Sequence, residues 1–152
     1  GPVKGRRGFT LIELLIVVSI LGLLASLVVP KVRLAKAKAQ ASEIVGAMRA
    51  VKIAATIYFD SAGTWPATTA AGTVPPGLEG YLPRAGLFTG NGWTLAWQRV
   101  AVVGGYTEGR LKADTSDPLL CPPLGILLGG SSATVSVSCG GGSGHVTQTV
   151  DR

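Results

Sequence analysis

Few residues of this chain could carry catalytic chemistry. The 152-residue sequence holds one histidine, His145, and two cysteines, Cys121 and Cys139. Hydrolysis needs a nucleophile beside a base, and the sequence holds no His-Cys-carboxylate cluster, phosphate-binding loop or metal-ligand spacing. His145 lies beside glycines, which favours a solvated turn residue. We expect no enzymatic activity and no cofactor; an enzyme with a single-pass membrane anchor is the alternative from another class.

The residue whose chemistry most needs an explanation is Glu13. It is the only charged residue in the apolar run Phe9–Val29. A carboxylate inside a membrane segment costs about 2.5–3.5 kcal/mol on insertion scales. Either another group offsets this cost, or Glu13 lies shallow near the interface and is hydrated or protonated. The spacing of residues leaves both readings open.

The run that contains Glu13 predicts a membrane helix. Its 21 residues would span about 30 Å as a helix, which matches the hydrocarbon thickness of a bilayer. It is apolar on all sides, unlike the amphipathic surface helix of a soluble domain. A cleaved secretory signal is disfavoured because the run exceeds the usual length of about 7–15 residues and basic residues separate it from the small residues at 35–37. Basic residues flank both ends, so the charge rule gives no orientation.

A second, amphipathic stretch of helix is predicted directly after the run. Pro30 removes one hydrogen bond and usually kinks a helix without ending it. From Ile44 to Tyr58 apolar residues recur at three- and four-residue spacing, with charged residues between them. We therefore expect one helix from Phe9 to about Phe59, roughly 75 Å long, whose second half packs on a domain.

The rest of the chain predicts a small antiparallel sheet of three to four strands. Residues 60–92 are dense in Gly, Pro, Ala and Thr and indicate a long connecting loop, either without regular structure or with one short helix. Residues 93–103 alternate and end at Gly104-Gly105, which predicts a hairpin. Residues 133–139 alternate again, and a glycine-rich turn leads to a strand over 145–150. The amphipathic half of the helix would cover this sheet, which gives an α+β fold.

The charge of the chain is concentrated around the apolar run. The net charge is +6, but from Asp60 onward five basic and six acidic residues give −1. A DNA-binding face is therefore not supported. Trp65, Trp93 and Trp97 could stack on bases if they were exposed, but we expect them in the core.

The segment Arg6-Arg7-Gly8-Phe9-Thr10-Leu11-Ile12-Glu13, followed by apolar residues to Val29 and then Pro30, resembles the N-terminus of type IV pilins and pseudopilins. The resemblance implies that a prepilin peptidase cuts between Gly8 and Phe9 and that the new amine of Phe9 is methylated. It implies that Glu13 pairs with the Phe9 amine of a neighbouring subunit. It also places Gly22 and Pro30 where such helices locally unwind during assembly.

The resemblance divides the chain into four parts: a leader peptide at 1–8, a membrane and assembly helix at 9–29, the amphipathic half of the same helix at 30–59, and a globular domain at 60–152. Cys121 and Cys139 resemble the pair that closes the C-terminal loop of many type IV pilins. A membrane anchor would also place them in an oxidising compartment, where one disulfide is expected. Two free or buried thiols are the alternative.

The function implied by the resemblance is that of a structural subunit, major or minor, of a type IV pilus-like filament. Its partners would be other pilin subunits, prepilin peptidase, the inner-membrane assembly machinery and membrane lipid. The chain would cross the inner membrane once with its N-terminus in the cytoplasm, and later join a periplasmic or extracellular filament. A DNA-uptake pilin and a type II secretion pseudopilin are alternatives. The second is disfavoured because Asp114, Asp117 and Asp151 do not have calcium-loop spacing, and we expect no metal.

Overall fold

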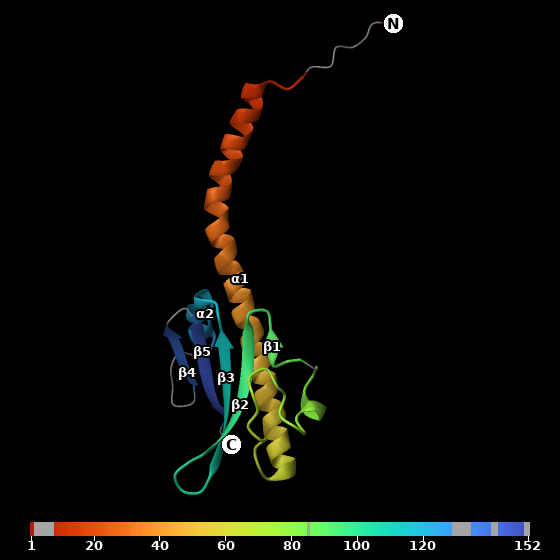
Figure 1. Ribbon diagram of the computed structural model, residues 1–152, viewed down its shortest axis with the longest axis vertical. Coiled ribbons are helices and arrows are strands. Elements are labelled where there is room, and N and C mark those ends of the chain that lie inside the picture. Colours follow the sequence, from red (N-terminus) through yellow and green to blue (C-terminus); the bar gives the residue numbers. More distant parts are fainter. Residues whose placement is uncertain (2–7, 85, 129–134, 141–142, 151–152) are drawn as a thin grey trace. The chain divides into compact units, whose positions relative to one another are not determined.

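The computed structural model describes residues 1, 8–84, 86–128, 135–140 and 143–150, the last two ranges mainly through their backbone. The chain divides into two compact units, Gly1–Lys36 and Ala37–Arg152. In chain order the elements are α1 (Leu11–Ala62), the 3-10 helix η1 (Glu79–Tyr81), β1 (Thr89–Gly90), β2 (Trp93–Ala101), β3 (Thr107–Thr115), the 3-10 helix η2 (Pro118–Leu120), α2 (Cys121–Leu127), β4 (Val135–Gly140) and β5 (Ser143–Val150), as Figure 1 shows.

The helix α1 contributes to both units. It begins two residues after the predicted start and continues through Pro30, as the sequence predicted. Its end differs from the prediction, because Asp60 and Ser61 still belong to the helix. The stop is Gly63, whose φ of +70° is the left-handed conformation that glycine adopts readily after a helix. Its N–H donates to the carbonyl of Phe59 at 2.8 Å.

In the second unit the strands form one antiparallel sheet in the order β1-β2-β3-β5-β4. The hairpin β2–β3 pairs Trp93 with Thr115 at one end and Ala101 with Thr107 at the other. The predicted turn at Gly104-Gly105 is confirmed, since both glycines have positive φ. The strand pair near the C-terminus is also present, with β5 beginning two residues before the predicted His145.

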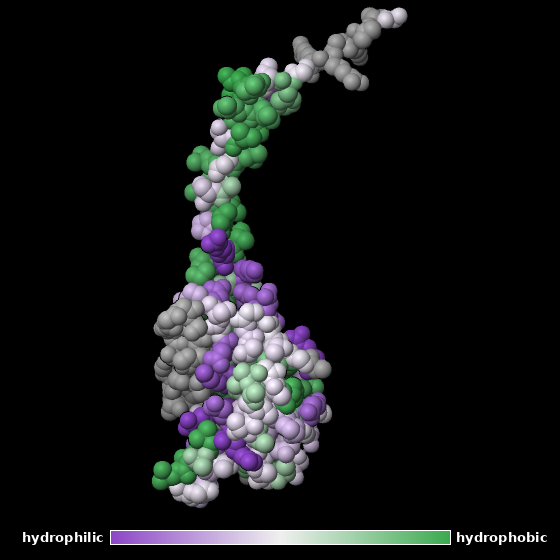
Figure 2. Space-filling view, viewed as in Figure 1, coloured by the Kyte–Doolittle hydropathy of each residue, from purple (hydrophilic) through white to green (hydrophobic). Residues whose placement is uncertain are grey.

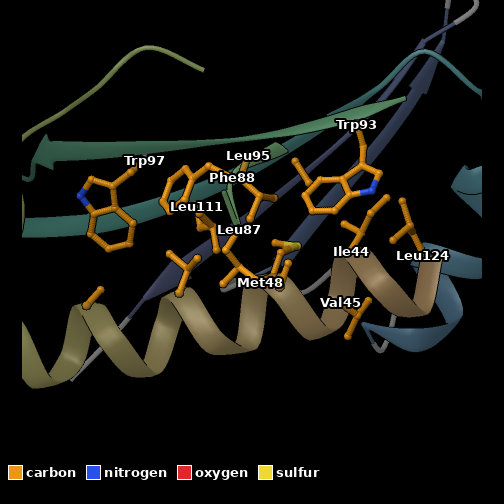
Figure 3. Packing of buried hydrophobic residues seen from close by; sticks show 14 of the residues in the cluster. Ile44, Val45, Met48, Leu87, Phe88, Trp93, Leu95, Trp97, Leu111 and Leu124 are labelled. Carbon is orange, nitrogen blue, oxygen red and sulfur yellow. The ribbon is translucent and has the colours of Figure 1, made fainter. Parts of the chain in front are cut away.

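The core of this unit lies between the second half of α1 and the sheet, as Figure 3 shows. Ile44, Met48 and Val51 have no exposed surface, and they face Phe88 and Leu95, which are equally buried. The charged residues between the helix positions, such as Glu43 and Arg49, are exposed. The predicted α+β fold, with a long helix packed on a small antiparallel sheet, is therefore confirmed. The predicted number of three to four strands is too low, because the sheet has five strands among the described residues, one of them the two-residue β1.

Several features of the elements were not predicted. In β3 the half-buried side chains of Glu108, Arg110, Lys112 and Asp114 alternate with buried small or apolar residues. The two-residue edge strand β1 interrupts the predicted loop, which otherwise holds only η1 among its described residues. The short helix α2 has prolines in its first turn, where the missing N–H is not needed. Ala133 and Thr134, where the C-terminal alternation was predicted to begin, lie outside the described residues.

Candidate assembly site at the start of the long helix

Thr10 caps the N-terminus of α1, and Thr10 and Glu13 have the Thr-x-x-Glu spacing of a capping box. Thr10 precedes the helix, and its hydroxyl accepts a hydrogen bond from the Glu13 backbone N–H at 3.3 Å. The same hydroxyl donates to Oε2 of Glu13 at 3.5 Å. This is the Thr-x-x-Glu arrangement in which a side chain satisfies an N–H group that the first turn of a helix leaves without a partner.

The capping box gives Glu13 a structural role that the sequence analysis did not assign. Glu13 is the acidic residue of the first turn, where the helix dipole favours a negative charge. Thr10 was missed as a site residue, although a Thr three positions before a Glu, ahead of an apolar run, is a sequence signal for such a start. Glu13 forms no salt bridge within 4.0 Å with another described residue.

The predicted cleavage bond lies just before this cap. Gly8, Phe9 and Thr10 are outside the helix and exposed, and the Phe9 side chain is 76% exposed. A peptidase must bind its substrate in an extended form, because a helix hides the peptide bond. The Gly8–Phe9 bond therefore has a local structure that suits cleavage.

Between Phe9 and Val29 the first unit presents an apolar surface on all sides. Its large apolar residues from Phe9 to Leu34 are between 44% and 82% exposed. Figure 2 shows these hydrophobic side chains along the first part of α1. The hydroxyls of Ser19 and Ser26 donate to the carbonyls of Leu15 and Leu23, each at 2.7 Å, so these polar groups are satisfied within the helix. By length and composition, α1 can cross a membrane.

Gly22 and Pro30 lie inside uninterrupted helix. A Cβ added at Gly22 would meet no heavy atom within 4 Å, so packing inside the chain does not require a glycine there. A glycine costs a helix about 1 kcal/mol relative to alanine, and proline costs more. Both residues therefore weaken α1. At Gly22 the structure describes no packing contact that would offset this cost.

The three tryptophans lie in the core, as predicted. Trp65, Trp93 and Trp97 are 4%, 3% and 0% exposed. The indole N–H of Trp65 donates to the Thr107 carbonyl at 2.9 Å, and that of Trp97 to the Pro66 carbonyl at 3.0 Å. Their rings are not available for stacking on the bases of a nucleic acid.

Asp114 and Asp117 have structural partners among the described residues. Asp114 forms a salt bridge with Lys112 at 3.1 Å, and the Asp117 carboxylate accepts from the Leu119 N–H at 2.9 Å and caps η2. Among the described residues no three His, Cys, Asp or Glu side chains gather as a metal site.

Cys121 is buried at the start of α2. Cys139 belongs to β4, and the side chains of Cys139 and His145 and all of Asp151 lie outside the description.

Comparison with known proteins supports the resemblance found in the sequence. The family model of the prokaryotic N-terminal methylation motif matches residues 3–29. A type IV major pilin of Neisseria gonorrhoeae is 41% identical over 74 residues, which are 49% of this chain and 35% of the relative. A fimbrial protein of Eikenella corrodens is 37% identical over 75 residues, 49% of each chain.

A protein from a secretion system is also similar. The type II secretion system core protein G of Klebsiella michiganensis is 38% identical over 65 residues, 43% of this chain and 46% of the relative. The chain thus spans less than half the length of each of these three relatives. No solved structure matches it.

The motif and the relatives together support a type IV pilin or pseudopilin, as the sequence predicted. The relatives are named as pilins, fimbrial proteins and a secretion-system core protein, and none of these names describes an enzyme. The apolar helix and the pilin relatives fit a membrane-anchored precursor and a surface filament.

Proposed function

We propose that this chain is a structural subunit of a type IV pilus-like filament, assembled through α1. The observation that carries the proposal is the exposed apolar surface from Phe9 to Val29 with a single carboxylate in its first turn. An apolar helix of this length is stable only in lipid or against other helices. The membrane provides the lipid before assembly, and a filament core built from such helices provides the helix contacts afterwards.

Processing comes first in this proposal. A prepilin peptidase on the cytoplasmic side cuts between Gly8 and Phe9, the leader 1–8 is lost, and the Phe9 amine is methylated. The helix stays in the inner membrane with its N-terminus in the cytoplasm until the assembly machinery transfers it to the filament. The match of residues 3–29 to a methylation motif and the exposed, non-helical Gly8–Phe9 bond support this order.

Glu13 then sets the register between subunits. The capping box holds its carboxylate in the first turn of α1, about one helical turn from Phe9. In the filament, the carboxylate pairs with the Phe9 amine of a neighbour, and each charge removes the cost of burying the other. Gly22 and Pro30 are the positions at which α1 loosens as it leaves the membrane, since both weaken a helix.

A disulfide between Cys121 and Cys139 belongs to the same proposal. It would join the start of α2 to β4 after the domain has entered an oxidising compartment. The absence of free cysteines among the described side chains supports it. In the chain-entropy model such a closure stabilises the domain by about 3 kcal/mol.

A type II secretion pseudopilin is the second candidate, and the similarity to a secretion-system core protein G favours it. Both candidates use the same helix and the same packing mode. A DNA-uptake pilin has less support, because the tryptophans are buried and the domain carries little net charge.

The proposal is tested by the recovery of filaments from cells that express the full chain with a pilus assembly machinery. The Glu13→Gln variant keeps the capping box, which accepts Gln as well as Glu, but loses the charge. We expect at least a tenfold loss of sheared filaments, equivalent to about 1.4 kcal/mol per contact. Glu43→Gln, on an exposed position of the same helix, is the matched control and should assemble normally.

Equal filament yields from Glu13→Gln and the unmodified chain would show that Glu13 serves only the helix cap. Absence of filaments from the unmodified chain, with the protein present in the membrane, would contradict the filament function itself.

A further inference from the structure

The hairpin tip, residues Val102–Tyr106 between β2 and β3, exposes apolar side chains at one end of the second unit. Val103 is fully exposed and Tyr106 is 76% exposed. The turn is defined by hydrogen bonds, because Val102 N–H donates to the Tyr106 carbonyl at 2.8 Å and Gly105 N–H to the Val102 carbonyl at 3.3 Å. The tip therefore presents its apolar groups in a defined geometry and not as a loose loop.

A groove between α1 and α2 lies within the same unit. The α1–α2 groove has a volume of about 300 Å³ and is lined by Lys38, Ser42, Pro123, Ile126 and Leu127. Ile126 is 81% exposed and Leu127 is 43% exposed, so one wall is apolar and open. The other wall carries an ammonium group and a hydroxyl. Ser42 donates its hydroxyl proton to the Lys38 carbonyl at 3.0 Å, which leaves its oxygen as an acceptor.

The tip and the groove lie at opposite ends of the unit. Along the hairpin, the pair Ala101–Thr107 adjoins the tip, whereas the pair Trp93–Thr115 leads into η2 and α2. Figure 1 shows the loop between β2 and β3 at the end of the sheet away from α2. One copy cannot place its tip in its own groove. Two complementary patches at opposite ends of a subunit make a heterologous contact, and such contacts can extend without closing.

We propose that the hairpin tip of one subunit docks in the α1–α2 groove of a second copy of this chain. Tyr106 suits the groove chemically, because its ring has an apolar body and a polar end. The ring packs against Ile126 and Leu127, while its hydroxyl donates to Ser42 and the Lys38 ammonium lies near the ring. Val103 adds an apolar contact at the rim. The contact rests on the proposed filament function and adds a link between the domains of two copies to the packing of the α1 helices.

The test places a photoreactive amino acid at the tip of the full-length chain. Tyr106 is replaced by p-benzoylphenylalanine in cells with the assembly machinery, membranes and sheared filaments are irradiated, and the joined peptides are identified by mass spectrometry. We expect a ladder of cross-linked copies in which the tip is joined to residues 123–127. The same probe at Tyr81, a tyrosine that is 41% exposed elsewhere in the unit, is the matched control and should not label that peptide.

A second variant tests the groove directly. Ile126→Lys, combined with the probe at position 106, should lower the yield of the 123–127 cross-link about tenfold, because a charge replaces the apolar wall. Since Ile126 is mostly exposed, this change should leave the fold intact.

The outcomes separate this contact from the filament function. A cross-link from the tip to residues 123–127 supports the contact whether or not filaments are recovered. No cross-link, a cross-link to another segment, or a yield that Ile126→Lys leaves unchanged overturns it. The filament function is judged separately, from the filaments seen by electron microscopy with the unmodified chain.

Discussion

At the scale of single residues, Glu13 has one role that the structure shows, in the helix cap, and one that is proposed, in pairing between subunits. Its carboxylate belongs to a capping box with Thr10, and it has no salt-bridge partner among the described residues. The cap explains part of why a charge is tolerated at the start of an apolar helix, since the first turn favours negative charge. The cap does not require a negative charge at position 13, because Gln can take the place of Glu in a capping box. A separate function for the charge is therefore open to direct test.

The cap itself gives a prediction about Thr10. Thr10→Ala removes the acceptor of the Glu13 N–H, so the first turn of α1 should lose about 1 kcal/mol. Hydrogen exchange of the amides in residues 11–14, measured on the full chain in detergent micelles, should become roughly five times faster. Thr10→Ser keeps the hydroxyl and should exchange as the unmodified chain does. Equal rates in Thr10→Ala would mean that the cap contributes nothing in a membrane-like environment.

A second prediction concerns Gly109 in β3. A Cβ at this position would overlap the Trp97 ring and would lie 3.4 Å from the Trp65 ring. Both rings are buried, so they have little room to move. Gly109→Ala should lower the free energy of unfolding by about 1–3 kcal/mol, measured by denaturant titration. Gly46→Ala, on an exposed helix position with nothing within 4 Å, should stabilise or leave stability unchanged. An unchanged midpoint for Gly109→Ala would contradict the packing described for Trp97.

At the scale of elements, α1 serves two environments with one continuous helix. From Leu11 to Val29 its surface is apolar on all sides, and after Ala37 only one face of the helix is buried. That change in pattern was predictable, because hydrophobic periodicity distinguishes the two cases. The end of the helix was less predictable. Asp60 and Ser61 disfavour helix only weakly, whereas Gly63 takes the left-handed conformation that terminates it.

The strands show a similar limit. The hairpin turn at Gly104-Gly105 and the pair near the C-terminus were predicted from alternation and glycine. The hairpin implied a partner strand after the turn, but the residues of β3 were not assigned, because its inward positions include Gly109 and Ala113, which carry little hydrophobic signal, while its other face is charged. It is held in the sheet by pairing with β2 and β5, and these are long-range contacts that local patterns do not reveal. The same reasoning applies to β1, whose two residues depend on β2.

The face of α1 that packs on the sheet gives a matched pair of substitutions. Met48 is fully buried against the sheet, whereas Ile57 on the same helix is 46% exposed. Met48→Ala should lower the free energy of unfolding by about 2–5 kcal/mol, while Ile57→Ala should change it by less than about 1 kcal/mol. Thermal unfolding followed by near-UV circular dichroism measures both. Similar losses in the two variants would mean that the buried face of the helix has been assigned wrongly.

At the scale of the whole molecule, each of the two units has properties that suit one part of the proposed function. The first unit is an apolar helix that suits lipid and then a filament core. The second is a small domain that buries its tryptophans and carries almost no net charge, which suits a surface component more than a nucleic-acid reader. The predicted site residues Gly8, Phe9 and Glu13 lie together at the N-terminus because they are close in sequence. The α1–α2 groove could not be foreseen, because it joins residues that only the fold brings together.

The most direct test of the central claim is mass spectrometry of the N-terminal peptide, from the full chain expressed with a prepilin peptidase. Pilin-type processing predicts a chain that begins at Phe9 and carries one methyl group on its amine. Gly8→Glu, which alters the residue before the bond in an exposed non-helical segment, should leave the leader attached. A chain that still begins upstream of Phe9, or one cut near Ala37, would contradict the account, and the proposed roles of Glu13 and of the filament would fall with it.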